Sequence, residues 1–118
     1  MDLSMPAGTP APTPTTAQTL VAEQLTAIEA LAVIGRTFAK LPAVNLSVGH
    51  LFPNTICIDV HDALSAFEAW RDALCIPVDR VHLRGTGERY IKAETIFHGA
   101  RVELTGYAQA ANEWGGAR

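Results

Sequence analysis

The segment YIKAETIFHGARVELTGY, Tyr90–Tyr107, predicts a β-hairpin whose register can be stated residue by residue. Apolar and polar residues alternate on both sides of His98-Gly99, as in two half-buried strands joined by a two-residue turn in which Gly99 supplies the positive φ. On the apolar face the predicted pairs are Phe97–Ala100, Thr95–Val102, Ala93–Leu104 and Ile91–Gly106. On the other face Tyr90, Lys92, Glu94 and Ile96 lie opposite Tyr107, Thr105, Glu103 and Arg101.

A third strand is predicted before this hairpin. The three strands cover about Arg80–Arg84, Arg89–Phe97 and Ala100–Tyr107. A two-residue loop at Thr86-Gly87 would place Val81 opposite Lys92, on the polar face. A loop of odd length or a glycine bulge instead places Val81 opposite Ile91. We therefore expect a three-residue turn or a bulge at Gly85-Thr86-Gly87.

Two amphipathic helices and a further pair of strands are predicted upstream. The first helix runs for about seven turns, from a capping box at Thr15 and Gln18 to Pro42. Its apolar stripe contains Leu20, Ala27, Leu31, Ile34, Phe38 and Leu41, widened by Val21, Leu25 and Ile28. The second helix starts at the N-cap Asp62 and ends before Pro77. Its apolar face contains Ala63, Leu64, Phe67, Trp70 and Leu74.

Between the helices the apolar period changes from 3.6 to 2, which indicates strands. Val44, Leu46 and Val48 form the apolar face of one strand, and Ile56, Ile58 and Val60 that of the next. The order α-β-β-α-β-β-β then predicts an α+β two-layer sandwich, with two helices packed on one face of a mostly antiparallel five-stranded sheet.

This fold occupies one predicted domain, residues 15–108. Residues 1–14 are rich in proline, alanine and threonine and predict a disordered arm. Residues 109–118 predict a flexible tail, in which Trp114 either docks on the domain, contacts a partner or does neither.

Charge and hydropathy exclude several classes of protein. The net charge of −3 gives no global positive field for nucleic acid or anionic lipid. Apolar runs stay well short of the ~20 residues of a membrane span, and the N-terminus shows no secretory signal. We therefore expect a cytoplasmic protein without a membrane partner. Cys57 and Cys75 lack CxxC spacing and predict free thiols.

The candidate site is the sheet face opposite the helices, because no third layer remains in the sequence to cover it. The predicted binding residues on this face are Arg80, His82, Arg84, Tyr90, Lys92, Arg101 and Tyr107. Aromatic side chains among basic ones are typical of single-strand nucleic-acid binders. The same face, or an edge strand, can bind a protein partner or a second copy. A solvated face with cross-strand ion pairs is the third interpretation.

Cys57, Asp59 and His61 form the one row of reactive side chains, since alternate residues of a strand point to the same side. Such a row could polarise a thiol or contribute to a metal site, although one strand cannot complete a tetrahedral one. The sequence has no phosphate loop or nucleophile motif. We therefore predict no catalytic residue, metal site or cofactor. A non-catalytic interaction module, with a protein partner or homodimer ahead of nucleic acid, is the predicted function, and a small enzyme using this row is the last alternative.

The segment FEAWRDALCIPVDRV (Phe67–Val81), followed by an alternating strand and RVELTGYA (Arg101–Ala108), resembles small uncharacterised α+β proteins of actinobacteria and their phages. The resemblance covers about residues 40–108. It implies an accessory or regulatory protein of a phage or mobile element, and it transfers no site residue to this chain.

Overall fold

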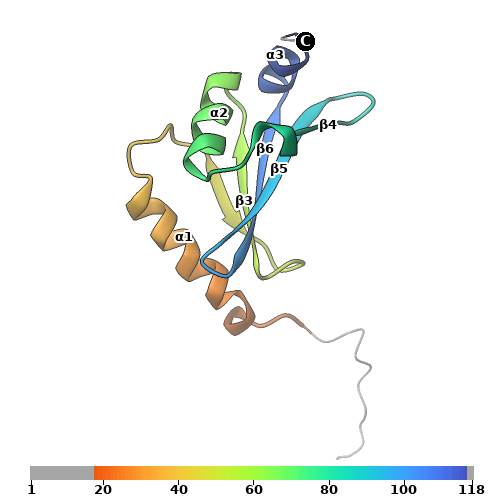
Figure 1. The fold of residues 1–118 in the computed structure, drawn as a ribbon. Coiled ribbons are helices and arrows are strands. Elements are labelled where there is room, and N and C mark those ends of the chain that lie inside the picture. Colours follow the sequence, from red (N-terminus) through yellow and green to blue (C-terminus); the bar gives the residue numbers. More distant parts are fainter. Residues whose placement is uncertain (1–17, 117–118) are drawn as a thin grey trace, which may run out of the picture.

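A computed structural model describes residues 18–116 of the chain. The elements are η2 (Val21–Gln24), α1 (Leu25–Thr37), β2 (Asn45–Val48), β3 (Thr55–Val60), α2 (Leu64–Ala73), η3 (Val78–Arg80), β4 (His82–Arg84), β5 (Tyr90–Phe97), β6 (Ala100–Tyr107) and α3 (Gln109–Gly116). The five strands form one sheet in the order β2-β3-β6-β5-β4 (Figure 1). The predicted α+β class and element order are confirmed, and a third helix follows them.

The β5–β6 hairpin has the predicted register at every pair from Phe97–Ala100 to Tyr90–Tyr107. His98 and Gly99 have φ angles of 50° and 82°, so both turn residues lie in the left-handed region that a type I′ turn requires. The turn therefore fixes which residues of β5 and β6 face the helices.

The β4–β5 connection differs from the prediction. Leu83, and not Val81, pairs with Ile91, because Val78–Arg80 form a 3-10 turn and β4 begins only at His82. The register differs by two residues, so His82 and Arg84 still lie on their predicted face. Arg80, predicted as the first residue of this strand, lies instead in η3, and the connection covers residues 85–89 instead of the predicted three-residue turn or bulge. Val81 remains buried at 8% exposure.

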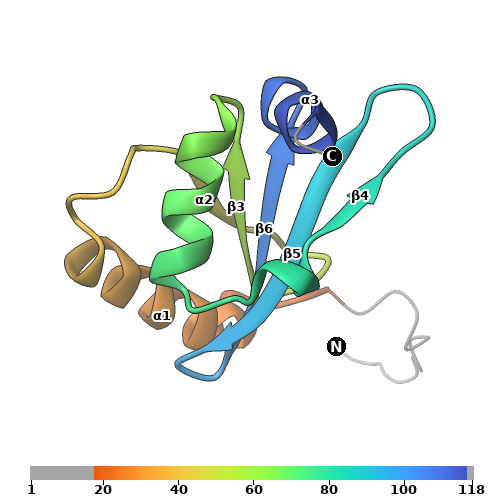
Figure 2. The same cartoon turned by 45° about the horizontal axis from the view of Figure 1, so that its top comes forward.

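The centre of the sheet is a parallel pair, β3 beside β6. Ile56, Ile58 and Val60 of β3 are fully buried there. Parallel neighbours need a crossover connection, and α2 lies within it. Figure 2 shows α2 between α1 and α3. Residues from all three helices join one hydrophobic core with β3, β5 and β6.

The first helix is shorter than predicted. The structure begins it as the 3-10 turn η2, where the Glu23 carboxylate accepts a hydrogen bond from the Leu20 N–H at 2.9 Å. Within η2 and α1 the buried residues are Ala27, Ala30 and Ile34. Four residues of the predicted stripe are therefore exposed: Leu20, Val21, Leu25 and Ile28. The predicted cap at Thr15 and the predicted arm, residues 1–14, lie outside the described residues.

The predicted flexible tail is wrong over residues 109–116, which form α3. Ala110 and Ala111 are fully buried and Trp114 is 8% exposed. The predicted N-cap at Asp62 is also wrong, since α2 begins at Leu64 with Ala63 as its N-cap. Glu113 of α3 accepts the Leu64 N–H hydrogen bond at 2.6 Å, so a side chain distant in sequence satisfies this helix end.

Candidate binding surface

The side chains opposite the helices form what we call the open face of the sheet. Strand pairing places on it Asn45, Ser47, Thr55, Cys57, Asp59, His82, Arg84, Tyr90, Lys92, Glu94, Ile96, Arg101, Glu103, Thr105 and Tyr107. Within residues 18–116 the buried core lies on the other side, between the sheet and its helices. The predicted faces of β5, β6 and β3 are thus confirmed.

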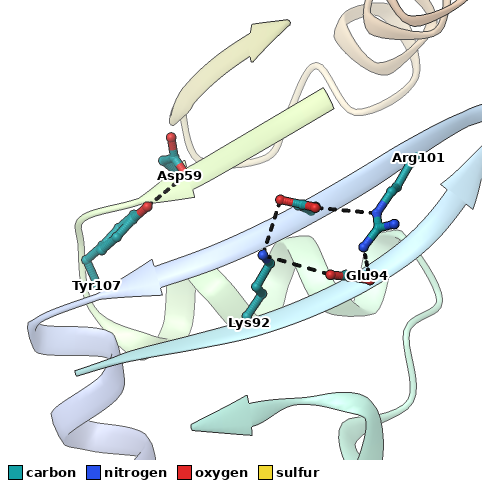
Figure 3. A network of polar contacts seen from close by, with 6 residues as sticks. Asp59, Lys92, Glu94, Arg101 and Tyr107 are labelled. Carbon is teal, nitrogen blue, oxygen red and sulfur yellow. Dashed lines mark hydrogen bonds and ion pairs between the residues drawn. The ribbon is translucent and has the colours of Figure 1, made fainter. Parts of the chain in front are cut away.

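An ion-pair network occupies the middle of the open face (Figure 3). Lys92 Nζ lies 3.3 Å from Glu103 and 3.9 Å from Glu94. Arg101 binds Glu94 at 2.7 Å and Glu103 at 3.4 Å. The hydrogen bond to Glu94 raises the pKa of Arg101. Two of the predicted binding residues, Lys92 and Arg101, therefore already have carboxylate partners within the protein.

Three rings form what we call the aromatic cluster: His61, Tyr90 and Tyr107. The His61 and Tyr107 rings are stacked, with centroids 4.8 Å apart and planes at 9°. Tyr90 lies 6.2 Å from Tyr107, its predicted cross-strand partner. Tyr107 also donates its hydroxyl hydrogen to Asp59 Oδ1 at 3.4 Å (Figure 3). Burial, and then the Asp59 charge, raise the pKa of Tyr107.

A hollow of about 620 Å³ adjoins the aromatic cluster. The β4–β5 loop, which extends beyond the sheet beside α3 (Figure 2), forms one wall. The lining residues are His61, Gly87, Glu88, Arg89, Tyr90, Tyr107, Ala108 and Asn112. Arg89 and Asn112 were not among the predicted site residues. Asn112 enters the site through α3, an element that the sequence did not predict.

A second hollow, of about 250 Å³, lies along β4. We call it the basic hollow, and its lining residues are Arg80, His82, Arg84, Lys92, Ala93 and Glu94. Four predicted binding residues therefore meet here. Of the other three, Tyr90 and Tyr107 line the 620 Å³ hollow beside the aromatic cluster, which we call the aromatic hollow. Arg101 lines neither of the two hollows.

Two members of the row Cys57, Asp59 and His61 contact Tyr107. Asp59 accepts the hydrogen bond from the Tyr107 hydroxyl, and the His61 ring is stacked on the Tyr107 ring. Burial raises the pKa of the Cys57 thiol, Glu103 and Asp59 raise it further, and Lys92 opposes them. The higher pKa favours the protonated thiol, which is a poor nucleophile. Within residues 18–116 no group of three or more potential metal ligands is present.

The described part of the chain contains no helix that is long and apolar enough to cross a membrane. Comparison with protein-family models, curated proteins and solved structures found no match, so the resemblance to small actinobacterial and phage proteins stays a prediction.

Proposed function

We propose that this chain is a non-catalytic interaction module whose open face binds a protein partner or a second copy of the chain. The observation that carries the proposal is the aromatic cluster beside the 620 Å³ hollow, on a face that residues 18–116 leave open. Tyrosine and arginine are enriched in the energetic centres of protein interfaces, because each provides a large contact area together with hydrogen bonds.

The charge pattern of the open face favours a protein over a nucleic acid. Three carboxylates lie among the cations of the open face: Asp59, Glu94 and Glu103. Asp59 accepts a hydrogen bond from Tyr107, and Glu94 accepts one from Arg101. A phosphate backbone would be repelled by these carboxylates and would have to compete with them for Lys92 and Arg101. A protein surface carries both signs of charge and can complement such a mixed pattern.

The test compares two aromatic residues, one half-buried and one exposed. Tyr90→Ser removes a ring of the aromatic cluster, and Phe52→Ser, in the β2–β3 turn and 72% exposed, removes a ring that belongs neither to this cluster nor to the 620 Å³ hollow. Self-association of the purified proteins is measured by sedimentation equilibrium, and partners are then identified by quantitative proximity labelling. We expect association by the wild type and Phe52→Ser and its loss in Tyr90→Ser. Unchanged association of Tyr90→Ser would contradict the proposal.

The nucleic-acid alternative is tested with the same three proteins. Fluorescence anisotropy with mixed-sequence single-stranded oligonucleotides at low salt reports binding directly. We expect no binding by the wild type. Salt-sensitive binding that Tyr90→Ser weakens would contradict the choice of a protein partner and assign the open face to nucleic acid.

A further inference from the structure

The basic hollow gathers its cations from three elements. Arg80 comes from η3, His82 and Arg84 from β4, and Lys92 from β5. His82 and Lys92 are cross-strand partners, so their side chains leave the sheet side by side. Arg80, His82 and Arg84 are exposed. The hollow is therefore a surface concavity in which basic side chains from three elements converge, with Glu94 as the one acidic lining residue.

Lys92 belongs to the ion-pair network of the open face, where it lies 3.3 Å from Glu103 and 3.9 Å from Glu94, and the other cations of the hollow are less neutralised. Within residues 18–116 no ion pair engages Arg80, His82 or Arg84. Glu94 is the one carboxylate that lines the hollow, and Arg101 binds it from outside at 2.7 Å. With His82 neutral and Lys92 offset by Glu103 and Glu94, the guanidinium groups of Arg80 and Arg84 leave a local excess of positive charge in a chain whose net charge is −3.

We propose that the basic hollow binds a small tetrahedral oxyanion of the phosphate class. Guanidinium groups present paired N–H donors that match two oxygens of a phosphoryl group, and the lysine adds a point charge to a third. A carboxylate offers two oxygens in one plane, whereas a phosphoryl group offers at least three in a tetrahedral arrangement, which suits cations that converge from different elements. The volume of about 250 Å³ equals roughly eight waters at about 30 Å³ each, which accommodates the anion with part of its hydration shell.

This inference does not depend on the proposed function. The aromatic cluster contributes no lining residue to the basic hollow. The phosphoryl group can belong to free phosphate or to a phosphorylated side chain, and the two probes below distinguish these sources.

The test is an amide NMR titration of the full chain with inorganic phosphate, and separately with sodium chloride at matched ionic strength. We expect saturable shift changes confined to residues 80–84 and 92–94 with phosphate and not with chloride. Arg80→Gln and Arg84→Gln should each weaken phosphate binding by about tenfold, since each removes a charged hydrogen-bond donor. Arg36→Gln, an exposed arginine of α1, is the matched control and should bind like the wild type.

A second titration uses a short phosphoserine peptide and its unphosphorylated form. Tighter binding of the phosphopeptide than of free phosphate assigns the hollow to a phosphorylated side chain, and equal binding assigns it to the free anion. Shifts that follow ionic strength alone, or that persist in Arg84→Gln, would overturn the proposal. Because Tyr90 is intact throughout, this failure is separate from a failure of the proposed function.

Discussion

Cys75 occupies a backbone position that usually requires glycine. Its φ is 61° at the end of α2. Its N–H donates to the Asp72 carbonyl at 3.0 Å, and the Ile76 N–H donates to the Arg71 carbonyl at 3.0 Å. These two hydrogen bonds define a Schellman motif, whose left-handed residue carries a steric penalty when it has a Cβ.

Cys75→Gly should therefore raise the free energy of unfolding by about 0.5–1 kcal/mol, the left-handed penalty less the entropy of a freer unfolded chain. Urea denaturation followed by circular dichroism measures the change. The control Cys75→Ala keeps the Cβ and should show no such gain. An equal gain in both variants would mean that the thiol, and not the backbone angle, is the destabilising feature.

Cys57 should react slowly with alkylating agents, because burial and the neighbouring carboxylates raise its pKa above the ordinary thiol value of 9.0. In a Cys75→Ser background, the pH profile of iodoacetamide alkylation should have its midpoint above 9.0. Lys92→Met should move that midpoint higher, since Lys92 lowers this pKa. A midpoint below 9.0 would contradict this prediction, because it would mean that Cys57 forms the reactive thiolate more readily than an ordinary cysteine.

The same shift links Cys57 to stability. Because the folded-state pKa lies above the unfolded value, the folded protein favours the protonated thiol. The contribution of this thiol to the free energy of unfolding is therefore complete at pH values below the unfolded pKa. The contribution is then lost as the pH rises through the folded pKa. Tyr107, whose pKa is also raised, acts in the same direction above 10.0, the ordinary pKa of a tyrosine hydroxyl. The free energy of unfolding should therefore decline as the pH rises above 9.0 and 10.0, the ordinary pKa values of the two groups.

At the scale of elements, Gly106 sets how closely two helices approach β6. A Cβ at this residue would lie 2.9 Å from Phe67 of α2, 3.0 Å from Ile91 and 3.1 Å from Ala110 of α3. Gly106→Ala should reduce the free energy of unfolding by about 1–3 kcal/mol through overpacking. Gly35→Ala in α1 meets no described atom within 4 Å and should instead add up to about 1 kcal/mol of helix propensity. Urea denaturation gives both values, and equal signs would contradict the argument.

Helix α3 makes a second prediction, because its Trp114 is buried at 8% exposure. Trp114→Ala should reduce the free energy of unfolding by about 3–5 kcal/mol, as for other buried aromatic residues. Chemical denaturation measures this change directly. A change below about 0.5 kcal/mol, the usual size for a surface substitution, would show that the segment behaves as the flexible tail predicted from its sequence.

The sequence predicted what local patterns control. The His98-Gly99 turn fixes the β5–β6 register, and alternation fixes which side chains share a face. The β3–β6 pairing was not predictable, because neighbours in a parallel pair come from distant segments and no turn joins them. Helix α3 was missed because it is short and ends in two glycines, which disfavour a helix, and its stability depends on tertiary contacts such as Glu113 with Leu64.

The candidate site likewise has features that local patterns predict and features that depend on the strand order. Alternation correctly grouped Tyr90, Lys92 and Tyr107 on one face, and strand pairing explains why. The stacking of His61 on Tyr107 required β3 to lie beside β6, and the aromatic hollow required α3. These features depend on the strand order, which sequence patterns left open.

At the scale of the whole molecule, the strand order makes the two halves of the chain interdependent. The segment with α1, β2, β3 and α2 contributes Ile56, Ile58 and Val60 to the core, and the segment with β4, β5, β6 and α3 contributes Val102 and Leu104. These residues meet at the central parallel pair, where all five are fully buried. Neither half thus has a complete core of its own, and we expect one cooperative unfolding transition.

The two tryptophans of the chain report on the two halves separately. Trp70 lies in α2, where its Nε1–H donates to the Pro42 carbonyl at 2.9 Å, and Trp114 lies in α3. Trp114→Phe leaves Trp70 as the probe of the first half, and Trp70→Phe leaves Trp114 as the probe of the second. In each variant the urea midpoint from fluorescence should coincide with the midpoint from circular dichroism, although the two variants differ in stability. Separated midpoints within one variant would mean that one half retains its structure after the other has unfolded. Because β3 and β6 bury each other, the geometry of the sheet predicts coincidence.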